Sequence, residues 1–416
     1  MTAAQLLTGI VAALLLQLVA GIGFSAWRRG RDGAKAPVAV QPNAKQPAAG
    51  AWPGWRKFRV ARREFEDAAH TQCSFYLEPL DGVALPPFRP GQFLTFALQV
   101  ADPLAARPGA QRAITRCYSL SAPPDPARYR VTTKRASPPQ DRPDAPPGVS
   151  SNHFHDQVRE GEVLEVKPPA GHFCLDTDPG VPVVLIAGGI GITPLLSMLA
   201  WCIDEQPGRD VHLYYGVRNS DVHAFKARLE QWAQQHARFH LSIVYSRPGP
   251  ADVQGRDYQH AGHVDAALLQ RTLPHGRHAF YACGPAPLME SLVPALAAWG
   301  VPQHDIHFEA FGPASVRAAR PEPSTVDPTV TPALEVRFDT SGRTLEWNGR
   351  DESLLDFAER HGVRVESGCR SGSCGTCETK LLAGSVRYLS PPDHDVAPGH
   401  CLLCVGTPAS NLVLAA

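Results

Sequence analysis

The residues best able to do chemistry are four cysteines near the C-terminus. Cys369, Cys374 and Cys377 stand in a loop rich in glycine and serine, and Cys404 follows after a long gap. This spacing lets one tight loop supply three thiolates and a later strand the fourth, which is an arrangement that holds two irons. The loop glycines allow backbone N–H groups to approach the sulfides and stabilise the reduced state. The pattern therefore predicts a 2Fe-2S cluster, a centre that takes up one electron at a time.

The same region leaves a second interpretation open. Cys374, Cys377, Cys401 and Cys404 also form two Cys-x-x-Cys pairs, which could make a structural zinc site. Zinc would leave Cys369 as an unused thiol, and the gap between the pairs is longer than the usual ribbon spacing. The cluster leaves only Cys401 unused. A disulfide framework is not indicated, because ten cysteines spread over 416 residues do not form a dense secreted scaffold.

Length and charge bound the class of protein. At one domain per roughly 150 residues, a chain of 416 residues suggests two or three domains, and we expect three. The 40 basic and 40 acidic residues balance, so no overall field attracts nucleic acid. A hydrophobic content of 44% is that of an ordinary globular protein.

The N-terminal segment differs in composition from the rest. Residues 1–27 carry no charge and are dominated by Leu, Ala, Val and Ile. This segment is long enough for a transmembrane helix. Arg28, Arg29 and Arg31 follow it, so the positive-inside rule places the catalytic domains on the cytoplasmic side of the membrane. We therefore expect a single-pass anchor, with a cleaved signal peptide as the alternative, and a flexible linker over 28–52.

Three modules are expected after the linker. Short β-branched and aromatic runs separated by Pro and Gly predict an antiparallel β-barrel over 53–175. Alternating strands and helices then predict an α/β domain with a parallel sheet over 176–313. A proline-rich linker over 314–332 leads to an α+β domain over 333–416, whose order of hairpin, helix and cysteine loop is that of a β-grasp ferredoxin.

The predicted α/β domain contains a turn suited to phosphate. An apolar strand runs into Gly188, Gly189 and Gly191, followed by Thr193, which can cap a helix, and Pro194, which fits a first helical position. The N–H groups and dipole at the start of that helix would face an anion such as a pyrophosphate. The turn departs from the common dinucleotide fingerprint, because Pro194 replaces the third glycine and no acidic residue ends the next strand.

Basic and hydroxyl side chains follow the next two predicted strands. Arg218 comes after one strand, and Ser246 and Arg247 come after the other. These groups could bind a 2′-phosphate where an NAD-specific enzyme often has a carboxylate. The pattern favours NADPH and leaves NADH open.

A predicted barrel strand carries Arg116, Tyr118 and Ser119. Residues two apart share one face of a strand, so Arg116 could pair with a phosphate while Tyr118 stacks on a flat ring. Ser119 could reach the edge of that ring from the other face or through its backbone. The turn at Gly148 and Ser151 opens a short helix that could close on the same phosphates.

Taken in order, these motifs resemble the ferredoxin–NADP reductase superfamily with a ferredoxin domain fused at the C-terminus. The carrying residues are Arg116-x-Tyr118-Ser119, the Gly188 to Pro194 turn and the run from Tyr281 to Pro285. The reductase half is most similar to that of flavohaemoglobins. The domain order is similar to phthalate dioxygenase reductase and to the reductases of hybrid-cluster proteins and membrane desaturases.

The resemblance implies further roles. Arg116, Tyr118 and Ser119 would hold the flavin, with Gly148 and Ser151 at its pyrophosphate, and Ser150 departs from the hydrophobic residue that is usual there. FAD is expected, with FMN as the second choice. The residues implied near the reacting rings are Cys283, Gly284, Glu309 and Phe311.

The expected function is electron transfer from NAD(P)H through FAD and the 2Fe-2S cluster to a separate protein. The predicted anchor points to a membrane-associated oxygenase, hydroxylase or desaturase as acceptor. The alternatives are a reductase of a soluble hybrid-cluster protein or of a small oxidant, and a non-enzymatic protein that holds zinc.

Overall fold

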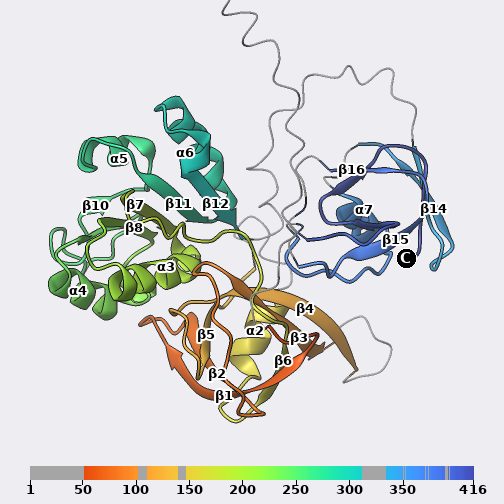
Figure 1. The fold of residues 1–416 in the computed structure, drawn as a ribbon, viewed down its shortest axis with the longest axis horizontal. Coiled ribbons are helices and arrows are strands. Elements are labelled where there is room, and N and C mark those ends of the chain that lie inside the picture. The colour runs from red at the N-terminus through yellow and green to blue at the C-terminus, as the bar shows by residue number, and fades with distance from the viewer. Residues whose placement is uncertain are drawn as a thin grey trace, which may run out of the picture. The chain divides into compact units, whose positions relative to one another are not determined.

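The computed structural model describes residues 51–101, 110–138, 147–311, 334–349, 351, 353–370, 372, 374–388, 392 and 394–416. Within these ranges the strands form two six-stranded sheets, one five-stranded sheet and one two-stranded sheet. Figure 1 shows them as three groups that follow one another along the chain.

The first sheet is antiparallel, with the strand order β4-β3-β6-β1-β2-β5. An isolated bridge between Leu120 and Val131 joins the ends of its two edge strands, so the sheet curves back on itself as a half-barrel. The aromatic side chains of Phe58, Phe75, Phe96 and Phe154 are fully buried inside it. The elements are β1 Arg56–Phe65, β2 Gln72–Pro79, β3 Phe93–Ala101, β4 Gln111–Ser119, β5 Tyr129–Lys134, α2 Val149–Asp156 and β6 Val163–Val166.

The second sheet is parallel, with the order β10-β9-β8-β7-β11-β12. Helices α3 and α4 pack on one face and α5 and α6 on the other. Both faces are therefore covered, which explains the unbroken apolar run of β7. The elements are β7 Val183–Gly188, η1 Gly189–Gly191, α3 Ile192–Glu205, β8 Val211–Val217, η2 Ser220–Val222, α4 Lys226–Gln235, β9 Phe239–Tyr245, β10 His260–Ala261, α5 Ala266–Thr272, β11 Ala279–Gly284, α6 Ala286–Ala298, η3 Gln303–Asp305 and β12 Ile306–Ala310.

The third group is a mixed sheet of order β14-β13-β19-β15-β17 with the small β16-β18 pair and helix α7. The backbone N–H of Asp356 donates to the Ser353 hydroxyl at 3.2 Å, which caps the start of α7. Phe338 and Phe357 are fully buried in its core. The elements are β13 Leu334–Phe338, β14 Arg343–Trp347, α7 Leu354–Arg360, β15 Glu378–Ala383, β16 Val386–Tyr388, β17 His400–Leu402, β18 Gly406–Pro408 and β19 Leu412–Leu414.

Hydrogen bonds join the half-barrel to the parallel sheet. The Ser197 hydroxyl donates to the Ala122 carbonyl at 2.8 Å, and the Gln72 side-chain amide donates to the Val222 carbonyl at 3.0 Å. The Phe225 N–H donates to the Glu66 carbonyl at 3.1 Å. These contacts bring the end of β5 to the carboxyl edge of the parallel sheet.

The predicted membrane anchor is corrected by the structure. Among the residues described above, no helix combines the length and apolar character needed to cross a membrane. Helix α3, for example, has 14 residues, about 21 Å at ~1.5 Å per residue, against a hydrocarbon core of ~30 Å. The predicted segment 1–27 itself lies outside the described residues. The single-pass arrangement at the cytoplasmic membrane, which rested on hydropathy and on the arginines after the apolar segment, is therefore wrong on this finding.

The predicted linkers also fall largely outside the described residues. Residues 28–50 and 314–332 are not among them, and only 51 and 52 of the first linker are. The proposed domain boundaries stay predictions.

Candidate functional site

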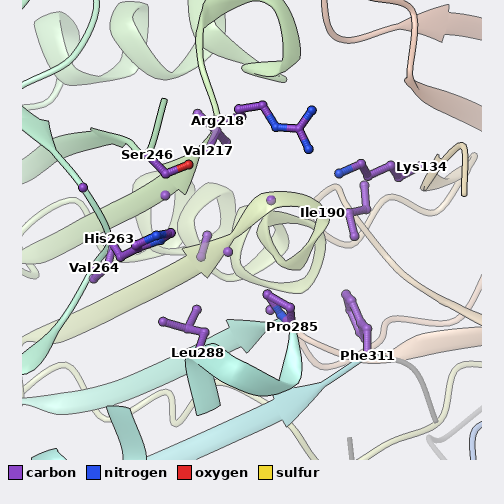
Figure 2. A pocket seen from close by; sticks show the side chains of 16 residues that line it. Lys134, Ile190, Val217, Arg218, Ser246, His263, Val264, Pro285, Leu288 and Phe311 are labelled. Carbon is purple, nitrogen blue, oxygen red and sulfur yellow. The ribbon is translucent and has the colours of Figure 1, made fainter. Parts of the chain in front are cut away.

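A cavity of about 380 Å³ opens at the carboxyl edge of the parallel sheet. The chain builds this sheet outward from β7 in one direction and then returns to add β11 on the other side, so the cavity lies at the switch point where such sheets bind ligands. Figure 2 shows side chains from several elements around it. The lining residues are Lys134, Ala187, Gly188, Gly189, Ile190, Gly216, Val217, Arg218, Ser246, Gly262, His263, Val264, Gly284, Pro285, Leu288 and Phe311.

The predicted glycine turn forms the floor of the cavity. A Cβ on Gly188 would lie 2.8 Å from the Cδ of Pro285, and a Cβ on Gly191 would lie 2.1 Å from the Cys283 carbonyl oxygen. Gly189 has a φ of +53°, in the left-handed region that favours glycine. Gly188 and Gly189 line the cavity, whereas Gly191 holds the turn against β11.

Helix α3 begins two residues earlier than its predicted start at Pro194. Gly191 is its N-cap, and no side chain caps it. Thr193 is buried in the first turn, where its hydroxyl donates to the Ile190 carbonyl at 3.1 Å. The Ile192 N–H already donates to the Gly189 and Ile190 carbonyls and Pro194 has no N–H, so the dipole of α3 is what suits an anion at this end of the helix.

Two cations face the cavity from different modules. Arg218 follows β8, as the sequence predicted, and Lys134 comes from β5 of the half-barrel. Within the described ranges, neither side chain forms an ion pair with a carboxylate. Loss of hydration and the neighbouring Arg218 lower the pKa of Lys134, although its side chain is exposed through the cavity mouth and the Asp67 carboxylate opposes the shift. The two positive charges therefore remain available to an anion.

Sequence reasoning missed Lys134 because it lies in a different module from the glycine turn. Its only signal was position, at the end of a predicted strand of the barrel. The opposite holds for Arg247, which was predicted at the nucleotide site. Arg247 is exposed and is not among the cavity-lining residues, whereas its neighbour Ser246 is.

The residues predicted near the reacting rings converge at the ends of β11 and β12. Cys283 pairs with Glu309 across the two strands, and the Phe311 N–H donates to the Gly284 carbonyl at 3.3 Å. Gly284 and Phe311 line the cavity, while Cys283 is fully buried behind it. Burial, and then the Glu309 charge, raise the pKa of Cys283 well above its usual range, so its thiol stays neutral.

The predicted flavin residues lie together at the end of β4. The Tyr118 hydroxyl is 2.8 Å from the Ser150 hydroxyl, and burial raises the pKa of Tyr118 to about 12. This contact gives a reason for Ser150, where a hydrophobic residue was expected: the serine supplies a polar partner for the Tyr118 hydroxyl. Ser119 is buried.

Arg116 and the start of α2 complete this group. Burial, and then the nearby Arg370, lower the pKa of Arg116, whose guanidinium donates to the carbonyls of Thr115 at 2.7 Å and Ser367 at 3.3 Å. Gly148 is the N-cap of α2, and a Cβ there would lie 2.5 Å from that of Ala136 and 3.0 Å from the Ser151 hydroxyl. A small residue is therefore required where the predicted flavin phosphates would approach.

The cysteine loop is built so that backbone groups face sulfur. The Cys369 N–H donates to the Cys374 sulfur at 3.2 Å, and the Cys374 N–H donates to the Cys369 sulfur at 3.3 Å. Cys377 and Cys404 are buried, and the contact with Cys404 lowers the pKa of Cys377. Four thiols with amide donors around them fit the donor set of a 2Fe-2S cluster.

Glycine geometry fixes this loop. Gly375, between two predicted ligands, has a φ of +71°, and a Cβ there would lie 2.3 Å from Cε1 of His394.

Among the described residues no three His, Cys, Asp or Glu side chains converge on a single metal ion.

Two parts of the chain match known family models. Residues 185–293 match the oxidoreductase NAD-binding domain, and residues 336–409 match the 2Fe-2S iron-sulfur cluster binding domain. The flavohemoprotein of Halalkalibacterium halodurans is 37% identical over 286 residues, which cover 68% of this chain and 66% of that protein. The chain thus spans just under two thirds of this curated relative.

Solved structures give the same result. The flavohem-like FAD/NAD-binding domain of nitric oxide dioxygenase from Vibrio cholerae is 30% identical, with a TM-score of 0.54, and the match covers 62% of this chain and 99% of that one. The chain belongs to the ferredoxin–NADP reductase superfamily. Phthalate dioxygenase reductase, described as a modular structure for electron transfer from pyridine nucleotides to [2Fe-2S], is 28% identical, with a TM-score of 0.52 and coverage of 87% and 98%. The superfamily, the order of its modules and the class of NAD(P)H-dependent electron-transfer oxidoreductase are thereby confirmed.

Proposed function

We propose that this protein takes electrons from NAD(P)H and delivers them one at a time, through FAD and a 2Fe-2S cluster, to a separate protein such as an oxygenase. The main support for this proposal is the cavity at the switch point of the parallel sheet, in a chain that also has the four-cysteine loop. The cavity suits a nucleotide that donates hydride, and the four-cysteine loop suits a centre that accepts single electrons. When bound, the flavin supplies the conversion between the two.

The residues of the cavity would bind and orient the nucleotide. The glycine turn and the positive end of the α3 dipole would hold its pyrophosphate, with Lys134 and Arg218 supplying positive charge. Phe311, Pro285 and Leu288 give the cavity an apolar wall at which the nicotinamide ring would be kept from water. Buried Cys283 and Glu309 would fix the strand ends behind that wall.

The residues of β4 and α2 would hold the flavin. Tyr118 and Ser119 would position the ring system, and Arg116 with the α2 start at Gly148 and Ser151 would bind its phosphates. FAD is favoured over FMN because the Vibrio cholerae relative is an FAD/NAD-binding domain. Cys369, Cys374, Cys377 and Cys404 would hold the cluster, and the loop amides would stabilise its added negative charge.

An oxygenase is proposed as the acceptor because the match to phthalate dioxygenase reductase extends over 87% of this chain and includes both redox modules. The electron leaves through the cluster domain, so the acceptor would dock beside the cysteine loop. A soluble hybrid-cluster protein or a small oxidant is an alternative outcome of the acceptor test below.

Anaerobic titration of the full-length protein tests the proposal. NADPH or NADH should bleach the visible flavin absorption and produce the EPR signal of a reduced 2Fe-2S cluster. Colourless protein with stoichiometric zinc would contradict it and support the binding protein. The acceptor is then sought by adding candidate oxygenase components and comparing the rates of reoxidation with those for a hybrid-cluster protein and for oxygen.

A further inference from the structure

The cavity has a polar end that the proposed electron transfer does not by itself explain. Arg218, Ser246 and His263 line it there, from the segments after β8, β9 and β10. These are three adjacent strands of the parallel sheet. Figure 2 shows Ser246, His263 and Arg218 on the side of the cavity away from Phe311.

Backbone hydrogen bonds fix these three segments relative to one another. The Ser246 N–H donates to the Val217 carbonyl, and the Gly262 N–H donates to the Tyr245 carbonyl, both at 2.9 Å. Gly262 has a φ of +110°, which only glycine adopts readily, and this turn brings His263 to the cavity. The next residue, Val264, packs against Gly216 at the end of β8, where a Cβ would be 3.4 Å from its Cγ2. The residues directly before and after His263 are therefore both held in place, and they fix its position.

The charge at this end is suited to an anion. The other ionisable side chains lining the cavity are Lys134 and Arg218, and both are cations. Among the described residues no carboxylate lines it, although enzymes that prefer NADH commonly use one to bind the 2′-hydroxyl. The nearest acid in sequence, Asp265, accepts a hydrogen bond from the Leu268 N–H at 2.7 Å, so its carboxylate caps α5.

We propose that the nucleotide is NADPH and that His263 is a specificity-determining residue, which donates to the 2′-phosphate together with Arg218 and Ser246. This inference rests on the proposed function and identifies its substrate. Even a neutral imidazole carries one N–H donor, so the preference for a 2′-phosphate over a 2′-hydroxyl should depend on the side chain at position 263.

The binding of nucleotide fragments measures the preference for a 2′-phosphate without any electron transfer. Calorimetry on the full-length protein would compare 2′,5′-ADP with 5′-AMP at a single pH. Wild-type protein should bind 2′,5′-ADP about tenfold more tightly, the effect expected of one charge-assisted hydrogen bond.

Two variants at this site test the histidine under the same conditions. His263→Leu, which has no donor, should lose most of the advantage, whereas His263→Lys, which keeps a donor, should retain it. His260→Leu is the matched control, because His260 lies in β10 but outside the cavity lining, and it should behave as wild type.

The outcomes are distinguishable from those of the proposed function. Equal affinity for the two fragments, or an unchanged advantage in His263→Leu, would overturn the inference while leaving NADH-driven electron transfer intact. A selective 2′,5′-ADP site in a protein whose flavin no nucleotide reduces would leave the inference standing and remove the proposed function.

Discussion

Single residues decide how the cavity recognises its ligand, and Lys134 is the first to test. It is a cation without a carboxylate partner among the described residues, and it comes from the half-barrel. Lys134→Met should raise KM for the nucleotide about tenfold or more, because a hydrogen bond to a charged group is lost at ~1.5–3 kcal/mol. The kcat for ferricyanide reduction should change little, since the ammonium need not touch the reacting rings.

Lys167→Met provides the control for this measurement. Lys167 also belongs to the half-barrel module, but its ammonium lies 5.1 Å from the centre of the Trp55 ring and outside the cavity lining. Its replacement should leave KM unchanged. An unchanged KM for Lys134→Met would remove this lysine from the nucleotide site.

At the residue scale, the sequence predicted side chains whose role depends on local spacing. The four cysteines and the glycine turn were found because their neighbours in sequence are also their neighbours in space. Lys134 and His263 could not be found in this way, because each reaches the cavity through pairing of distant segments. Arg247 was placed at the site by its position after a strand, but it is exposed and does not line the cavity, whereas its neighbour Ser246 does.

The glycine turn η1 and strand β11 form the element on which the cavity depends most. Gly191→Ala would bring a methyl group to 2.1 Å from the Cys283 carbonyl oxygen, so one of two backbone segments must move. We expect a loss of about 1–3 kcal/mol in the free energy of unfolding, together with weaker nucleotide binding. Denaturant unfolding and a nucleotide titration measure the two effects.

Gly208→Ala is the matched substitution for this test. Gly208 lies in the same domain with a negative φ, and nothing is within 4 Å of its added Cβ. This variant should be as stable as wild type or slightly more so, because alanine restricts the unfolded chain. Equal stability of the two variants would show that the close approach of η1 to β11 is not required.

The opposite edge of the parallel sheet carries a group of histidines. His212 stacks on His240 with ring centres 4.5 Å apart and meets His278 edge-on at 6.0 Å. Burial, and then these two neighbours, lower the pKa of His212 to about 4, with Asp210 opposing the shift. The folded protein therefore keeps His212 neutral where the unfolded chain would bind a proton.

Stability should consequently fall as the pH drops from about 6.5 to about 4, the window between the unfolded and folded pKa of His212. Over the full window the loss is on the order of 3 kcal/mol, and above it His212 contributes no pH dependence. His212→Gln, which cannot bind the proton, should show a shallower fall in Tm between pH 6.5 and 4.5. The exposed His275→Gln should follow the wild-type slope, and parallel slopes for all three proteins would contradict the prediction.

Strongly patterned elements were predicted closely. Strands β5 and β6 lie in the module predicted as an antiparallel barrel, and β13 and β14 form the predicted hairpin, because each combines β-branched residues with flanking turn residues. The start of α3 was misplaced since Pro194 is tolerated anywhere in the first turn, where its missing N–H has no partner to lose. The two-residue strand β10 carried no recognisable pattern, and it is the strand that places His263.

At the scale of the whole molecule, composition and motif order predicted the three modules, and the comparisons confirm the superfamily. The membrane anchor was the failure at this scale. Hydropathy measures how apolar a segment is, but it does not show that the segment forms a helix of sufficient length. The acceptor proposed above is therefore argued from the match to phthalate dioxygenase reductase rather than from a membrane.

Cysteine substitutions distinguish a 2Fe-2S cluster from a zinc site and so test the electron path through the whole molecule. The cluster requires Cys369 and leaves Cys401 unused, whereas the zinc alternative requires Cys401 and leaves Cys369 unused. Cys369→Ser should therefore lose iron and the EPR signal, while Cys401→Ala should keep both.

Activity then shows which step the cluster serves. In Cys369→Ser the nucleotide should still reduce the flavin, and ferricyanide reduction should persist, because the cavity and β4 are unchanged. Transfer to the protein acceptor should fall to background, since the acceptor takes its electrons from the cluster. Zinc that is retained in Cys369→Ser and lost in Cys401→Ala would reverse the assignment and make the C-terminal domain a zinc-binding module.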